Sequence, residues 1–300
     1  MTPTRRLDRL GSAGLRAVAR EPRAEIRGRR LEVANRPLLV VVPYLALDTD
    51  RRVGEPAETE KTEKIEKTET IEQRRGVMDG LGLRVRHSDP DLHRRLGPRP
   101  ILQRIVFDIA EQFRCEALAD PNMSGVAANT AAAFDRWSDA ARAARVGETG
   151  VGLLVFTVTH MLRSRLLRIP TGEAVDDLIE VTRGNLARLI GHALKELPTA
   201  VASQADFAVP AAEIARLVAE MVDDASESLE DAPASVIENA LLIPIDWDLL
   251  NELGAPGAAD RSAATMEPGY HVFTTAFDAE VAAIDLYRPA AIRELRRNLD

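Results

Sequence analysis

The stretch "PILQRIVFDIAEQFRCEALA" constrains the fold of this chain more than any other feature of its sequence. Its large apolar residues recur at intervals of three and four, which places them on one face of an α-helix that begins after Pro100. These residues are Leu102, Ile105, Val106, Ile109 and Phe113. Four later segments also have helical spacing, at residues 124–144, 151–167, 171–197 and 210–225. The chain is therefore predicted to be mainly α.

The starts of three of these segments carry recognised helix signals. Ser124 and Thr171 are predicted N-caps, because a side-chain hydroxyl can accept a hydrogen bond from an unpaired backbone N–H of the first turn. Pro210 is predicted to lie in the first turn of the last helix. The segment at 151–167 is apolar enough for a central buried helix, although its β-branched residues leave a strand open over 153–159.

A small β element is predicted near the N-terminus. The segments "AEIRGRRLEVA" and "PLLVVVPYLAL" are rich in Val, Ile and Leu, and "NRP" separates them, which predicts a pair of strands. The segment "RLDRLGSAGLRAVAR" before them has helical spacing, weakened by two glycines.

Composition divides the chain into five parts. The run "ETEKTEKIEKTETIE" is of low complexity and offers only Ile65 and Ile71 for burial, so a solvated helix or mobile linker is expected there. Six acids without a base at 220–231, followed by Pro, Gly and Ala, predict an acidic linker. The expected division is an N-terminal helix and β-hairpin element (1–57), the low-complexity segment (58–73), a helical domain (74–222), the linker (223–268) and a short C-terminal α/β tail (269–300).

Charge and hydropathy argue against nucleic-acid and membrane roles. The net charge is −8, and the arginines of residues 1–36 alternate with apolar residues without the aromatics that stack on bases. The longest apolar run, Leu38 to Leu47, is too short to span a bilayer and contains Pro43. Without an apolar signal-peptide core at the N-terminus, a cytoplasmic location is expected. A single cysteine, Cys115, rules out an internal disulfide.

The helix after Pro100 also carries the chain's most concentrated candidate chemistry. Asp108, Glu111 and Cys115 follow one another at i, i+3 and i+7, so they form a stripe that could hold a metal together with a distant histidine. Each acid, however, has an arginine at ion-pairing distance along the helix: Arg104 for Asp108, and Arg114 for Glu111. A structural role is therefore favoured over a metalloenzyme site, and neither a catalytic residue nor a metal ligand is assigned. The five histidines form no metal-binding motif.

Three segments in order resemble the CobT subunit of aerobic cobaltochelatase, which takes part in inserting cobalt into a corrin ring. They are "RGVMDGLGLRVRHSDPDLHRRLGP", "FDIAEQFRCEALADPNMSGVAAN" and "YHVFTTAFDAEVAAIDL". The residues on signature positions for which the resemblance implies a structural or subunit-contact role are Asp89, His93, Asp108, Glu111, Gln112, Arg114, Glu116, Gly125, Asn129, Phe273 and Asp278. Ala119 departs from the family pattern, which has a glycine there, and Tyr287 stands where a cysteine is usual.

The resemblance implies a non-catalytic, chaperone-like subunit. Its expected partners are an AAA+ ATPase subunit and a large corrin-binding subunit, with self-association left open. ATP with Mg²⁺ and the substrate cobalt would belong to the complex, a ligase that forms nitrogen–metal bonds, and no cofactor is expected in this chain. The family's C-terminal von Willebrand A domain would follow Asp300, so this sequence corresponds to the region before it. The alternative is an interaction module for a related AAA+ ATPase that acts on another client, without a cobalamin role.

Overall fold

The computed structural model describes residues 3–27, 30–46, 71–148 and 150–223, which lie in a compact unit spanning residues 1–258. The predicted linker and tail, and all but the last three residues of the low-complexity segment, fall outside the described residues. The prediction of a mainly α chain with a small N-terminal β element is confirmed. Within the described ranges, no helix combines the length and apolar character needed to cross a membrane.

The helices are α1 (Pro3–Ala19), α2 (Ile71–His87), α3 (Pro90–Leu96), α4 (Ile101–Ala117), α5 (Ser124–Ala143), α6 (Gly150–Leu167), α7 (Glu173–Ala200) and α8 (Gln204–Asp223). There are also two short 3₁₀ turns among the described residues: η1 (Pro43–Leu45), which follows the β element, and η2 (Val146–Glu148), between α5 and α6. The segment 153–159, which the sequence left open as a strand, lies within α6.

The β element is a three-stranded antiparallel sheet in the order β1 (Ala24–Arg27), β2 (Arg30–Val33) and β3 (Arg36–Leu38). The prediction of two strands was therefore wrong, because the first predicted strand folds back on itself and Arg27 pairs with Arg30. Ala34 and Asn35 link β2 to β3 with φ angles of 53° and 62°, the two left-handed residues that suit a tight hairpin. The apolar run after them leaves the sheet at Leu38 and reaches η1.

Three predicted helix starts were wrong. Met123, not Ser124, is the N-cap of α5, and Gly172 rather than Thr171 is the N-cap of α7. Helix α8 begins at Gln204, so Pro210 lies inside it. Proline inside a helix costs a backbone hydrogen bond. In the turn before Pro210, Phe207 and Ala208 are buried, and the packing of α8 against α4 and α7 outweighs that local preference.

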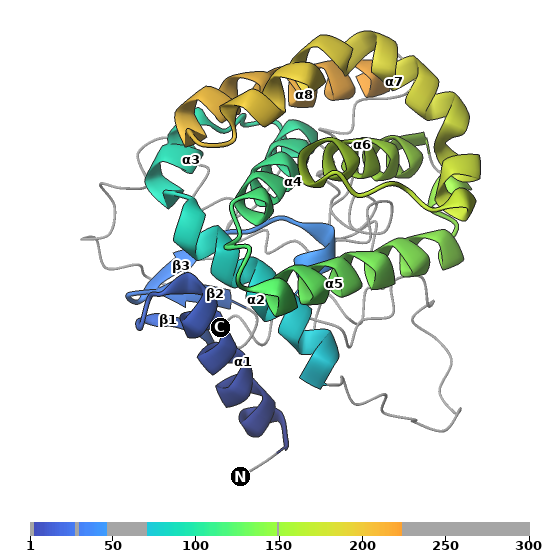
Figure 1. The fold of residues 1–300 in the computed structure, drawn as a ribbon. Helices are drawn as coiled ribbons and strands as arrows, with labels where there is room; N and C mark the ends of the chain where they lie inside the picture. Colours follow the sequence, from blue (N-terminus) through green and yellow to red (C-terminus); the bar gives the residue numbers. More distant parts are fainter. Residues whose placement is uncertain (1–2, 28–29, 47–70, 149, 224–300) are drawn as a thin grey trace, which may run out of the picture. The chain divides into compact units, whose positions relative to one another are not determined.

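Helices α4 and α6 form the centre of the fold. Figure 1 shows α7 and α8 arching over one side of this pair and α2 and α5 on the other, in agreement with the contacts of α4 with α8, α6 and α2. Residues 105–115 of α4 are all buried, and so are residues 154–163 of α6. The amphipathic spacing of α4 predicted one buried face, but its polar face is buried as well. The polar groups of α4 must therefore find partners inside the protein.

Candidate functional site

Asp108 lies at the centre of a buried charge cluster. Its side chain has no exposed surface, and its Oδ1 lies 3.3 Å from Nη2 of Arg84 and 3.4 Å from Nε of Arg104. The backbone N–H of Val41 donates to Oδ2 at 3.3 Å, which connects α4 to the segment after β3. Burial alone would raise the pKa of Asp108, but Arg104, His93 and Arg84 together hold it well below its usual value. Asp108 is therefore a carboxylate.

The imidazole of His93 completes this cluster from α3. Its Nε2 contacts Oδ1 of Asp108 and lies 2.9 Å from Nη2 of Arg84. Because the ionised Asp108 can only accept, the proton of the neutral ring is assigned to Nε2, where it points at Asp108. In this tautomer Nε2 accepts no hydrogen bond from Arg84. The ring also stacks on Phe107, with centroids 4.8 Å apart. Burial, followed by the charge of Arg84, lowers the pKa of His93, so the ring is neutral at pH 7.

One helical turn further along α4, Glu111 and Arg114 form a second buried ion pair. Nε and Nη2 of Arg114 each donate to a different carboxylate oxygen of Glu111 at 2.7 Å, the two-bond geometry that makes arginine–carboxylate pairs strong. The hydroxyl of Ser88 donates to Oε1 of Glu111, also at 2.7 Å. Both ion pairs that the sequence predicted along α4 are therefore present.

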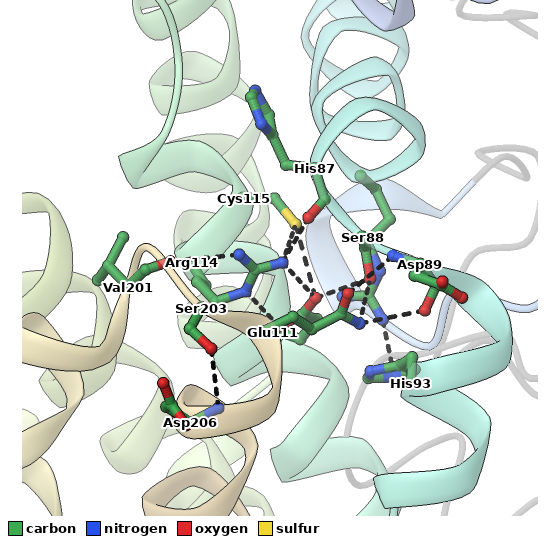
Figure 2. A network of polar contacts seen from close by, with 12 residues as sticks. His87, Ser88, Asp89, His93, Glu111, Arg114, Cys115, Val201, Ser203 and Asp206 are labelled. Carbon is green, nitrogen blue, oxygen red and sulfur yellow. Dashed lines mark hydrogen bonds and ion pairs between the residues drawn. The ribbon is translucent and has the colours of Figure 1, made fainter.

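Arg114 also reaches two distant parts of the chain. Its Nη2 donates to the carbonyl of His87 at the end of α2, at 2.5 Å, and its Nη1 donates to the carbonyl of Val201 in the α7–α8 turn, at 3.2 Å. Figure 2 shows Arg114 between these groups, with Glu111 beside it. One guanidinium thus supplies donors to two helix ends whose carbonyls have no partner within their own helices.

Gln204, at the start of α8, joins the α7–α8 turn directly to the α2–α3 turn. Its amide nitrogen donates to Oγ of Ser88 and to the carbonyl of Asp89, each at 3.1 Å. Its amide oxygen accepts from the backbone N–H of Asp89 at 2.8 Å. The carboxylate of Asp89 caps α3 by accepting from the N–H groups of Asp91 and Leu92, each at 2.9 Å. The α2–α3 turn and the α7–α8 turn are therefore joined across α4.

The C-terminal end of α4 carries a third polar group. Oε1 of Glu116 accepts from the hydroxyl of Tyr44 at 2.7 Å and from Nε2 of Gln112 at 3.0 Å, and that amide also donates to the carbonyl of Gly80 at 3.1 Å. Burial raises the pKa of Glu116, and burial together with Glu116 raises that of Tyr44. The Tyr44 ring stacks on Phe113, with centroids 5.8 Å apart. This group fastens η1 and α2 to the central helix.

Asn129 and Gly125 lie on α5, in different environments. Nδ2 of Asn129 donates to Asp79 of α2 at 2.6 Å, and the two helices approach so closely that a Cβ at Gly76 would lie 2.3 Å from the Asn129 carbonyl oxygen. Gly125 is exposed, and a Cβ placed there would meet nothing within 4 Å. Of the eleven signature residues, Phe273 and Asp278 lie outside the described residues, and Gly125 is the single described member that has no contact to explain it.

The network keeps the Cys115 thiol protonated and surrounds Asp108 and Glu111 with cations. Burial, followed by the charge of Glu111, raises the pKa of Cys115 to about 12, so the thiol stays protonated. Asp108 and Glu111 are occupied by separate sets of cations, and His93 contacts only the first. Among the described residues, no group of three or more His, Cys, Asp or Glu side chains is placed to bind a metal ion.

Sequence reasoning missed the partners that come from other elements. Arg84, Tyr44, Ser88 and Gln204 complete the network but lie on α2, η1, the α2–α3 turn and α8. The only signal for Arg84 was a lone arginine within the apolar "MDGLGLRV" segment. Its side chain is 2% exposed, and an arginine that deep requires an acid partner.

Together, the fold and this network define a helical protein whose charged signature residues fasten its helices to one another. A model of the family described as "Cobalamin biosynthesis protein CobT" matches residues 34–237, more than half of the 300-residue chain. The chain belongs to the CobT family, and this membership supports a role in cobalamin biosynthesis. No curated protein and no solved structure matches it.

Proposed function

We propose that this chain is a non-catalytic subunit of a cobalt-inserting chelatase, in which it works with an AAA+ ATPase on a large corrin-binding subunit. The family match is the observation that carries this proposal. In this proposal ATP hydrolysis belongs to the ATPase, and cobalt is a substrate of the complex. This chain contributes by binding: it transmits the conformational changes that the ATPase drives to the large corrin-binding subunit.

The side-chain contacts of the signature residues support a non-catalytic role for this chain. Both carboxylate oxygens of Asp108 and of Glu111 are occupied by donors of the same domain. An acid or base that served a substrate would need at least one oxygen or nitrogen open to it. These residues therefore stabilise the domain, and contacts with other subunits belong to its exposed surface.

A reconstitution with the ATPase and the large subunit encoded in the same genome tests the proposal. Cobalt insertion into a metal-free corrin is followed by absorbance, with and without this chain and with and without ATP. We expect insertion only when all three proteins and ATP are present. Insertion at an equal rate without this chain would refute the proposal.

The same proteins separate the proposal from its alternative. Co-purification measures whether the chain binds the ATPase. Binding to the ATPase without any effect on cobalt insertion would favour an interaction module that serves another client. Failure to bind either protein would contradict both functions.

A further inference from the structure

A second feature, separate from the α4 network, is an open groove between α6 and α7. The groove has a volume of about 620 Å³ and lies along the C-terminal half of α6, the connection at 168–171 and the facing side of α7. Pockets of this size accommodate small organic molecules. We call it the arginine groove, after its lining residues Arg165, Arg168 and Arg183.

The charge of the arginine groove is unbalanced. Three arginines line it, and none of its lining residues is acidic. Asp176, beside the groove, pairs with Arg183 and accepts from the hydroxyl of Thr171. For the guanidinium of Arg168, the described part of the chain provides neither an ion pair nor a hydrogen bond. Setting one acid against three arginines leaves an excess of about two positive charges, which favours an anion.

Two of the three arginines are already held in place. Arg183 is fixed by its ion pair with Asp176, and Nε of Arg165 donates to the carbonyl of Leu194 at 3.3 Å. These contacts leave further N–H groups on both guanidiniums. A planar guanidinium presents paired donors that match the oxygens of carboxylates and phosphates. Because their positions are set beforehand, less conformational freedom is lost when an anion binds.

The remainder of the groove is largely apolar. Ile179 is fully buried and Met161 nearly so, while Leu194 and Pro198 form part of the wall. His160, 4% exposed, also lines it, with Nε2 within 3.1 Å of the hydroxyl of Ser138. Burial, followed by Arg163, lowers the pKa of His160 to about 4, so this ring adds no charge at pH 7. The surface therefore combines an apolar wall with a cationic rim.

From this combination we infer that the arginine groove binds a small organic anion, whose carboxylate or phosphate oxygens contact Arg165, Arg168 and Arg183 and whose apolar body lies against Leu194 and Pro198. This inference does not depend on the proposed function, because it concerns a surface of the isolated chain. Carboxylates and phosphates share the oxygen geometry that the guanidiniums recognise, and separate probes distinguish them.

Isothermal titration calorimetry of the full chain at low salt tests whether the arginines of the groove bind an oxyanion. The probes are phenyl phosphate and benzoate, one for each oxyanion. We expect at least one to bind, and Arg168→Gln to weaken it about 10-fold, the loss of one charge-assisted hydrogen-bonding group. Arg188→Gln is the matched control, because Arg188 lies on α7 outside the groove and bonds Asn185 instead. Absence of binding by both probes, or equal weakening by the two variants, overturns the inference.

A comparison of two probes tests whether the apolar wall of the groove contributes to binding. Phenyl phosphate is expected to bind about 10-fold more tightly than inorganic phosphate, because its ring removes apolar surface from water. Equal affinities would show that the apolar wall takes no part in binding. Thermal denaturation of each variant verifies folding, and Arg168 is exposed, so its substitution leaves the core intact.

Discussion

Glu111 and Arg114, one turn apart on α4, are joined by two hydrogen bonds of 2.7 Å with both side chains almost fully buried. Because Arg114 also binds the carbonyls of His87 and Val201, this pair fixes the ends of α2 and α7 to the central helix. The pair therefore stabilises the fold, and its contribution to the free energy of unfolding can be measured on the isolated chain, without the complex.

Arg114→Ala should destabilise the isolated chain by about 3–5 kcal/mol, since it leaves the Glu111 carboxylate buried without its cation. Chemical denaturation followed by circular dichroism gives this free energy. Arg216→Ala is the control, because Arg216 forms its ion pairs on the exposed face of α8, where such pairs contribute at most about 1 kcal/mol. Similar losses for the two variants would contradict the structural role of Arg114.

The two members of the buried pair should also be strongly coupled. In a double-mutant cycle of Glu111→Gln and Arg114→Ala, the combined loss should be smaller than the sum of the single losses by about 1–3 kcal/mol. The exposed pair Glu213 and Arg216 provides the reference cycle. Additive losses at Glu111 and Arg114 would show that the bond geometry contributes little.

His160 should make stability depend on pH between 6.5 and about 4. Its pKa is lowered in the folded protein to about 4, so at intermediate pH the unfolded chain binds a proton that the folded chain does not. Its stabilising contribution is complete above pH 6.5 and is lost as the pH falls toward 4, by no more than about 3 kcal/mol.

His160→Gln should reduce this part of the pH dependence, measured by urea denaturation at a series of pH values. His192→Gln is the control, because the His192 side chain is 90% exposed. An unchanged slope in the His160 variant would refute the assignment.

Gly76 should tolerate no side chain. In Gly76→Ala, the new Cβ would lie 2.3 Å from the carbonyl oxygen of Asn129, so α2 and α5 must move apart, at a cost of about 1–3 kcal/mol. Gly184→Ala is the matched control on α7, where nothing lies within 4 Å, and should stabilise its helix by up to about 1 kcal/mol. Melting temperatures of the two variants should therefore shift in opposite directions.

Gly125 can separate fold stability from subunit contact. Gly125→Lys should leave the stability of the isolated chain within about 0.5 kcal/mol of the parent, because the position is exposed and open. If α5 contacts another subunit there, the same variant should lower co-purification and cobalt insertion in the reconstituted complex. The control is Gly184→Lys, also exposed and open. Full assembly with Gly125→Lys would exclude a contact at this position.

The central helix illustrates how far the sequence could predict the site. Its start after Pro100 was predicted, and its two ion pairs followed from spacing, because residues three and four apart lie on the same side of a helix. The burial of its polar face did not follow. That depends on α8, α3 and the segment around Val41, which reach α4 from distant parts of the chain.

The start of α8 was also decided by contacts that local spacing does not show. Pro210 is a sound local signal for a helix start, yet the helix begins six residues earlier, at Gln204. The added turns bury Phe207 and place Gln204 against Ser88 and Asp89. Packing and hydrogen bonds between elements decided this boundary, and neither is visible in local spacing.

The sequence by itself therefore determined the helical class, the positions of most helices and the ion pairs within α4, since all of these arise from interactions between near neighbours in the chain. Only the tertiary structure decided that Asp108 would meet Arg84 and His93, that Arg114 would join two distant turns, and that three arginines would gather in one groove. These arrangements depend on which helices pack together, and that is settled by the burial of apolar surface over the whole domain.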